Sequence, residues 1–158
     1  MQYILMILFA AFSVGLDQIT KYWVVENIPL FSRQEAIPGL FHLTYVQNTG
    51  AAFSSFEGMI WLFVVIFALF TLFLAWEFAK NRWGFTTLEK WFLVAVYAGG
   101  LGNVIDRIRL GFVVDMIAVD FMEFPVFNVA DCFITCGCIA LLVHLIFFNK
   151  GFWKEDKK

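Results

Sequence analysis

The chain has 158 residues, a length that suits a single domain, 1–158. Hydrophobic residues make up 61% of it and charged residues 15%, whereas globular domains average about 45–50% apolar and about 25% charged residues. A soluble domain of this size could not bury so much apolar surface, so we expect lipid to surround the chain. The formal net charge of −2 excludes the basic surface that nucleic acid requires of a partner.

Four long apolar stretches follow one another, and each approaches the ~20 residues that cross ~30 Å of hydrocarbon as a helix. They cover about residues 3–25, 59–79, 88–106 and 130–148. The first has neither a basic start nor an A-x-A cleavage site, so we interpret it as a retained helix rather than a signal peptide. The predicted fold class is therefore mainly α, an integral membrane protein with four transmembrane helices.

Two of the connections between these stretches are long, 26–58 and 107–129. Residues 41–46 of the first alternate apolar and polar side chains and include β-branched and aromatic types. This pattern is typical of a half-buried strand. We therefore expect the first long connection to form a small β-cradle at one membrane surface.

The orientation in the membrane follows from where the basic residues lie. They gather at the short connection and in the C-terminal tail: Lys80, Arg82, Lys90, Lys150, Lys154, Lys157 and Lys158. The positive-inside rule places both segments in the cytoplasm, and an even number of helices then places the N-terminus there too. The two long connections are predicted to face outward.

Polar side chains that would lie at membrane depth are costly, so they are candidates for function. Three pairs have helical spacing near the predicted outer helix ends: Asp17 with Lys21, Asn103 with Arg107, and Asn128 with Asp131. Asp115 lies in an apolar, strand-like part of the second outer connection, and Asn48 lies near the end of the first. Topology predicts that all of them gather at one side of the membrane.

Each of these groups also has a purely structural interpretation. The first pair could be a buried ion pair, Asn103 a helix–helix hydrogen bond, and Asp131 part of a helix N-cap. Asp115 alone could be a surface charge. Among the remaining polar residues, Asp106, Asp120 and Glu123 are expected to be solvated, and His144 to be a satisfied histidine. The functional interpretation depends on the convergence of the set.

The chemistry that such a set can perform is narrowed by what the chain lacks. Its two histidines, His42 and His144, are predicted on opposite sides of the membrane, which excludes a Ser-His-Asp triad, and no H-E-x-x-H motif is present. No histidine or carboxylate pattern completes a metal site around the three cysteines, so we interpret those as packing residues. Two aspartates that share a proton can activate water and protonate a leaving amine. Asp115 and Asp131 form the best pair, because apolar neighbours flank both.

Five motifs that appear in order carry a resemblance to a known family. They are Asp17-Gln18-Ile19-Thr20-Lys21, Asn48-Thr49-Gly50-Ala51-Ala52-Phe53, Gly102-Asn103-Val104-Ile105-Asp106-Arg107, Val113-Val114-Asp115 and Phe127-Asn128-Val129-Ala130-Asp131. Together they closely resemble the bacterial lipoprotein signal peptidase family, signal peptidase II. The resemblance extends from the first to the fourth predicted helix.

This resemblance implies a membrane-embedded aspartic endopeptidase of the bacterial inner membrane, multi-pass, with both termini cytoplasmic and no metal or cofactor. It implies prolipoprotein substrates whose lipobox cysteine carries diacylglycerol, with cleavage just before that cysteine. Membrane lipid is the other expected partner, and a monomer is the expected state. The family's catalytic aspartates match Asp115 and Asp131. Its support residues match Asp17, Lys21, Asn48, Gly50, Gly99, Asn103, Arg107, Asn128 and Ala130. Cys132 departs from the small serine or alanine expected there.

Two other classes of membrane protein compete with this interpretation. A transporter would use buried Asp, Lys and Arg as a proton or solute path, but it would distribute them through the membrane thickness. The uncharged run 59–76 and the clustering at one side favour a peptidase. A scaffold without chemistry would lose only stability when its aspartates are replaced.

Overall fold

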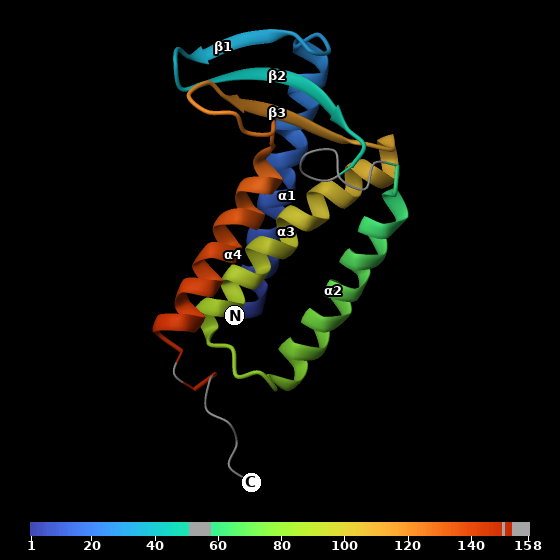
Figure 1. Cartoon of the computed structure of the whole chain (residues 1–158). Coiled ribbons are helices and arrows are strands. Elements are labelled where there is room, and N and C mark those ends of the chain that lie inside the picture. Colours follow the sequence, from blue (N-terminus) through green and yellow to red (C-terminus); the bar gives the residue numbers. More distant parts are fainter. Residues whose placement is uncertain (51–57, 150, 153–158) are drawn as a thin grey trace.

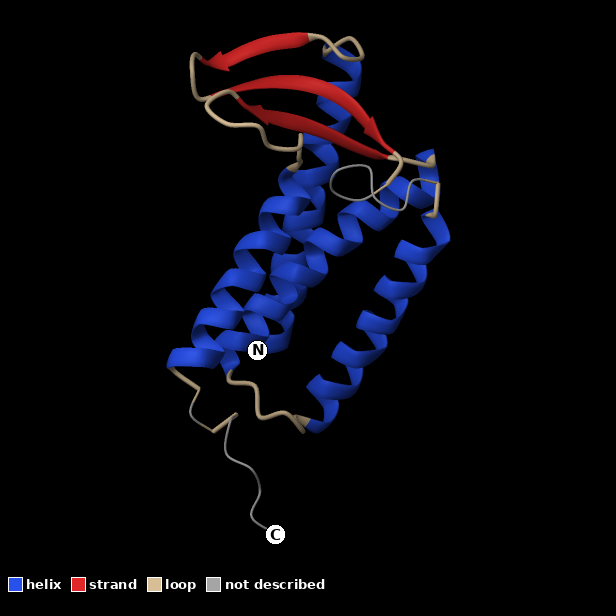
Figure 2. Ribbon diagram, viewed as in Figure 1, coloured by secondary structure: helices blue, strands red, loops and turns tan. Residues whose placement is uncertain are grey.

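The computed structural model of the chain describes residues 1–50, 58–149 and 151–152. Its elements, in chain order, are α1 (Gln2–Asn27), β1 (Arg33–Ile37), β2 (Phe41–Asn48), α2 (Ile60–Lys80), α3 (Thr87–Leu110), β3 (Val113–Val119) and α4 (Val129–Phe147). Figure 1 shows a helical bundle with the strands at one end, and Figure 2 shows that helix dominates the fold. Residues 51–53 of the second motif and the lysines of the tail lie outside the described residues.

The helices are suited to lipid by length and by their outer faces. Within the described residues, α1, α2 and α4 are long and apolar enough to cross a membrane. The four predicted transmembrane helices also include α3, whose 24 residues are long enough to cross a membrane but carry more charge. Because α3 packs against α1, α2 and α4, its polar residues face protein rather than lipid. Large apolar side chains such as Ile7 and Phe12 of α1 are exposed, as lipid-facing residues are.

Both ends of α3 are set by local sequence. Thr86 accepts a hydrogen bond from the backbone N–H of Glu89, and Glu89 accepts one from Thr86, which forms a capping box. Gly111 ends the helix with φ 82°, a conformation that glycine adopts without steric cost. The helix therefore runs four residues beyond the predicted end at 106. Arg107 and Arg109 belong to α3 and not to the outer connection.

The β-cradle is an antiparallel sheet with the strand order β1-β2-β3. Strand β2 contains the predicted segment 41–46, and β1 precedes it in the first long connection. The third strand comes from the second long connection, so both connections build the sheet. Asn48 at the end of β2 pairs with Val113 at the start of β3, which brings the two connections together next to the helices.

The opposite end of the bundle is held by a separate polar cluster. The carboxylate of Glu89 on α3 contacts Nδ1 of His144 on α4 and Nδ2 of Asn149, each over 2.8 Å. The prediction that His144 has a partner is confirmed. In Figure 1 the start of α1, the loop from α2 to α3 and the end of α4 all lie at this end.

Candidate functional site

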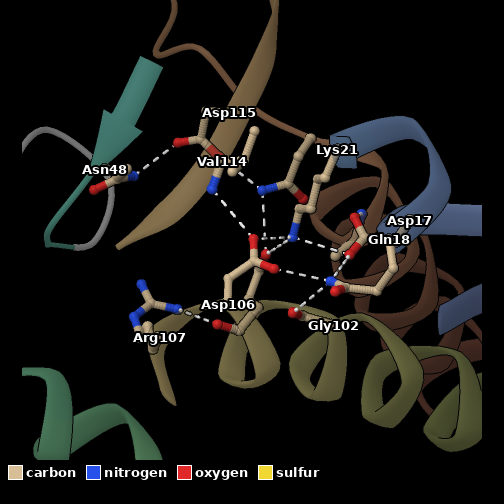
Figure 3. Close-up of polar contacts among 12 residues, drawn as sticks. Asp17, Gln18, Lys21, Asn48, Gly102, Asp106, Arg107, Val114 and Asp115 are labelled. Carbon is tan, nitrogen blue, oxygen red and sulfur yellow. Dashed lines mark hydrogen bonds and ion pairs between the residues drawn. The ribbon is translucent and has the colours of Figure 1, made fainter. Parts of the chain in front are cut away.

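The predicted polar residues meet where the sheet joins the bundle. Figure 3 shows Asp17 and Lys21 from α1, Asp106 and Arg107 from α3, Asn48 from β2 and Asp115 from β3 around one point. Hydrogen bonds link Asn103 of α3, together with Asn128 and Asp131 at the start of α4, into the same cluster. The convergence expected from topology is therefore present in the fold.

Asp115 is a buried carboxyl group held by two amide side chains. Its side chain lies within the sheet end of the cluster, and the residue is only 3% exposed. Oδ2 accepts a hydrogen bond of 2.9 Å from Nδ2 of Asn48, and Oδ1 accepts one of 2.7 Å from Nδ2 of Asn128. Burial raises the pKa of Asp115 to about 6, with Asp131 adding to the rise and the bond from Asn48 opposing it.

Asp131 has two roles that the sequence presented as alternatives. Its Oδ2 accepts a hydrogen bond of 3.1 Å from the backbone N–H of Asn128, and its own N–H donates to Oδ1 of Asn128 over 3.0 Å. This is the capping box of α4. The other oxygen, Oδ1, accepts a bond of 2.8 Å from Nδ2 of Asn103. The cap thus fixes the carboxylate at a helix N-terminus beside the rest of the cluster.

Two asparagines connect the aspartates to each other and to a buried lysine. Nδ2 of Asn128 donates to Oδ1 of Asp115 and also lies 3.1 Å from Oδ1 of Asn103. That same oxygen of Asn103 accepts a hydrogen bond of 2.9 Å from Nζ of Lys21. Because Asn128 and Asn103 each satisfy several partners, neither can rotate without leaving a buried polar group unpaired.

Lys21 lies between two carboxylates, not one. Its Nζ is 2.9 Å from Oδ2 of Asp17 and 2.9 Å from Oδ2 of Asp106, and all three side chains are nearly fully buried. The predicted pair of Asp17 and Lys21 is present. The prediction that Asp106 is solvated is wrong, because α3 packs against α1 and Asp106 pairs there with Lys21. Asp120 is also largely buried, bound by Arg33 and His42 in the sheet, whereas Glu123 is exposed as predicted.

The carboxylates of this ion cluster also bind backbone. Oδ1 of Asp17 accepts a bond of 2.9 Å from the N–H of Ala130, the residue before Asp131. Oδ2 of Asp106 accepts a bond of 3.2 Å from the N–H of Val114, the residue before Asp115. The ion cluster therefore supports the backbone next to each of the two aspartates.

Gln18 is a functional candidate that the sequence reasoning missed. Its Nε2 contacts Oδ1 of Asp106 over 2.9 Å and Oδ2 of Asp17 over 3.2 Å. It stands inside the first motif, between Asp17 and Lys21, which was the available signal. An uncharged residue at a helix surface gave no other reason to select it.

Arg107 and Gly50 connect α3 to the first long connection. Nη2 of Arg107 donates a hydrogen bond of 2.7 Å to the carbonyl oxygen of Gly50. The N–H of Gly50 in turn donates to Oδ1 of Asn48 over 3.0 Å. The guanidinium therefore helps to hold the loop that delivers Asn48 to Asp115.

The helices approach closely where small residues face one another. Ala130 is fully buried, and a Cβ atom added at Gly99 would collide with the carbonyl oxygen of Ala130. A Cβ at Gly102 would lie 2.6 Å from Oδ2 of Asp17. Both glycines are therefore required for α3 to pack against α1 and α4 beside the aspartates.

A cavity of about 1300 Å³ opens beside the two aspartates. Its walls come from α2, α3 and α4, from the end of β2 and from residues 123–127 of the loop before α4. Asp115, Asp131, Asn103 and Arg107 line it together with many apolar side chains. Cys132 and Cys136 of α4 are exposed and line the same cavity.

The described residues contain no group of three histidine, cysteine or carboxylate side chains arranged to bind a metal ion. What the cavity offers is a pair of carboxyl groups in a partly apolar wall, with amide donors and a guanidinium nearby. The donors of such a wall can bind the carbonyl groups of an extended peptide, and its carboxyl groups can activate water by acid–base chemistry.

Comparison with known proteins assigns the chain to a family. The family model described as signal peptidase (SPase) II matches residues 9–147. The lipoprotein signal peptidase of Enterococcus faecalis is 44% identical over 153 residues, which cover 95% of this chain and 92% of that protein. That of Streptococcus thermophilus is 42% identical over 147 residues, covering 90% and 88%.

Solved structures agree with the sequence relatives. A bacterial membrane enzyme determined by the in meso method at 2.3 Å resolution matches with a TM-score of 0.83 and 31% identity, over 97% of this chain and 93% of that one. A second, at 1.9 Å resolution, matches with a TM-score of 0.79 and 32% identity, over 90% and 93%. The chain therefore belongs to the signal peptidase II family.

Proposed function

We propose that Asp115 and Asp131 are the catalytic dyad with which this membrane peptidase removes signal peptides from prolipoproteins. One observation carries the proposal: Asn128 bonds the carboxylate of Asp115 through its side chain and that of Asp131 through its backbone. The two carboxylates thus share a neighbour and line one cavity. The membrane location and the peptidase activity follow from the family, and the assignment of the dyad is our own.

The raised pKa of Asp115 supports a division of labour within the pair. Since burial favours its neutral form, Asp115 holds the shared proton in weakly acidic solution. Ionised Asp131 takes a proton from a water molecule, which attacks the scissile carbonyl while Asp115 donates its proton to the carbonyl oxygen. When the tetrahedral intermediate collapses, that oxygen returns a proton to Asp115, and Asp131 gives its proton to the leaving amine.

The neighbouring residues support this reaction by position and charge. Arg107 and Asn48 are proposed to donate hydrogen bonds to carbonyl groups of the substrate backbone. Asn103 holds Oδ1 of Asp131, and Lys21 holds Asn103. Asp17 holds the N–H of Ala130 in the first turn of α4. The carbonyl oxygen of Gly50 accepts a hydrogen bond from Arg107, and Gly99 permits the close approach of α3 to α4.

The substrate that fits is a prolipoprotein with diacylglycerol on its lipobox cysteine. Its acyl chains would remain in lipid, so the scissile bond before the cysteine would lie near the membrane interface. A dyad at the helix ends, under the sheet, could meet the bond there. We further propose that the enzyme acts as a monomer in the bacterial inner membrane, with lipid around its helices. Its termini are then cytoplasmic and its site near the outer face.

The test is cleavage of a diacylated lipobox peptide in detergent. Asp115→Asn and Asp131→Asn are each expected to lower kcat by about 10²- to 10⁴-fold, because each removes one proton-transfer group. Glu35→Gln is the matched control, since this carboxylate is exposed on β1. Thermal unfolding of all variants checks the fold. Near wild-type cleavage by either folded dyad variant would show that the assignment is wrong.

A further inference from the structure

Arg107 is a partly buried cation whose charge has no close counter-ion among the described residues. The ion pairs found there within 4.0 Å involve Lys21, Arg33, His42 and His144 as the basic partners. Within the described part of the chain, its guanidinium donates to two carbonyl oxygens, those of Gly50 and Asn103. Its Nε is buried and has no hydrogen-bond partner among those residues. Something other than a carboxylate therefore contributes to holding the group.

An aromatic ring of α2 supplies that contact. The guanidinium carbon of Arg107 lies 4.2 Å from the centre of the Phe63 ring. A cation within about 6 Å of a ring centroid is attracted by the negative face of the ring, and the attraction grows when water is excluded. Both residues line the cavity that contains the dyad.

We propose that Phe63 is a positioning residue, whose ring keeps the Arg107 guanidinium at the cavity wall and out of an ion pair with the catalytic aspartates. The proposal rests on the dyad assignment and on the role of Arg107 given above. Arg107 interacts electrostatically with both Asp115 and Asp131. Attraction toward these carboxylates is therefore always present, and the contact with the Phe63 ring counteracts it.

The consequence of losing the ring follows from the charges around Asp115. The charged groups facing it are Asp131 on α4, Lys21 on α1 and Arg107 on α3. If the guanidinium moved toward the carboxylates, it would stabilise their ionised forms and remove the shared proton at a lower pH. It would also leave the position from which it can hold the substrate backbone. The first effect would shift the pH dependence of cleavage, and the second would weaken substrate binding.

Helix α2 has a second attachment that is independent of Phe63. The ring of Phe67 stacks on Tyr97 of α3 with centroids 5.1 Å apart, and it lies where a Cβ at Gly100 would be only 3.0 Å away. Removing the ring of Phe63 therefore leaves the packing of α2 against α3 in place. This makes a folded variant obtainable.

The experiment compares Phe63→Leu with Phe73→Leu in the full-length enzyme acting on the diacylated peptide. Phe73 is on the same helix but contacts Trp83 at the other end of the bundle, so it is the matched control. Phe63→Leu is expected to raise KM by about 3- to 30-fold, the loss of one cation–π contact. It is also expected to move the alkaline limb of the pH profile to lower pH. Phe73→Leu should change neither quantity.

A second variant keeps the shape of the ring and changes only its electrostatics. Fluorinated phenylalanine at position 63 has a weaker negative face, so KM is expected to rise with each added fluorine. Equal KM values and equal pH profiles for wild type, Phe63→Leu and the fluorinated series would overturn the proposal. Activity retained by Asp115→Asn would instead show that the dyad is wrong, while the order of KM among the Phe63 variants would still decide the role of the ring.

Discussion

Nδ2 of Asn128 donates a hydrogen bond of 2.7 Å to Oδ1 of Asp115, so the residue that caps α4 also holds a carboxylate of the sheet. One side chain thereby joins β3 to the start of α4. Asn128 is fully buried, and losing its partners would leave an unsatisfied polar group. The geometry of the site therefore depends on the docking of β3 against the start of α4.

The pH dependence of cleavage is expected to report Asp115. Its pKa is raised to about 6, so the carboxyl is protonated below that pH and able to donate. Above it Asp115 loses the proton that it donates, and kcat/KM is expected to fall about tenfold per pH unit. A profile from about pH 4.5 to about pH 8.5 measures this limb. A rate that stays constant across this range would contradict the assignment of the shared proton to the pair.

Asn48→Ala is expected to move that limb to higher pH. The hydrogen bond from Asn48 to Oδ2 of Asp115 favours the ionised carboxylate and lowers its pKa, so removing it raises the pKa further. The neighbouring Gln47 bonds the hydroxyl of Tyr45 instead, which makes Gln47→Ala the control for the pH limb. A shift of the limb to lower pH in Asn48→Ala would show that the bond does not act on Asp115.

Asp106→Ala is expected to reduce both stability and activity. It removes one of the two carboxylates that pair with Lys21. It also removes the acceptor for the backbone N–H of Val114, the residue before Asp115. A buried charged hydrogen-bond partner of this kind contributes about 1–3 kcal/mol, since Asp17 remains as a partner for Lys21. Chemical or thermal unfolding in detergent measures the loss. If unfolding and cleavage were both unchanged, Asp106 would not support β3.

Gly99→Ala tests the close approach of α3 and α4. The added methyl group would meet the carbonyl oxygen of Ala130 and lie 2.7 Å from Cγ1 of Ile134, so the helices must separate. We expect a loss of about 1–3 kcal/mol, as for overpacked cores, together with reduced cleavage. Gly15→Ala is the control, because nothing lies within 4 Å of its added Cβ atom. Equal stability of the two variants would contradict the proposed contact.

Glu89→Ala is expected to lower stability without altering KM. Its carboxylate accepts bonds from the N–H of Thr86, from Asn149 and from His144, at the end of the bundle away from the dyad. One buried and two partly buried hydrogen bonds are lost, so about 1–3 kcal/mol of the free energy of unfolding should be lost. Unfolding measured beside steady-state kinetics separates the two effects. A raised KM would reveal coupling between the two ends.

The helices and their approximate ends followed from apolar runs, because lipid demands long helices whatever the tertiary contacts are. The largest error lay at the end of α3, which the sequence placed at 106 because charged residues begin there. Packing of α3 against α1 gives the Asp106 carboxylate a partner in Lys21, and the helix continues to Leu110, where Gly111 ends it. The same packing explains why Asp106 is buried and not solvated.

The sequence by itself determined the membrane class, the strand at residues 41–46 and the residue types of the site, since composition, alternation and motifs are local properties. Only the tertiary structure decided which of these side chains touch. The pairing of Lys21 with Asp106, the hydrogen bond from Asn128 to Asp115 and the contact of the Phe63 ring with Arg107 each join two different helices or strands. Such contacts depend on how the helices and strands pack, and no periodicity in the sequence encodes that arrangement.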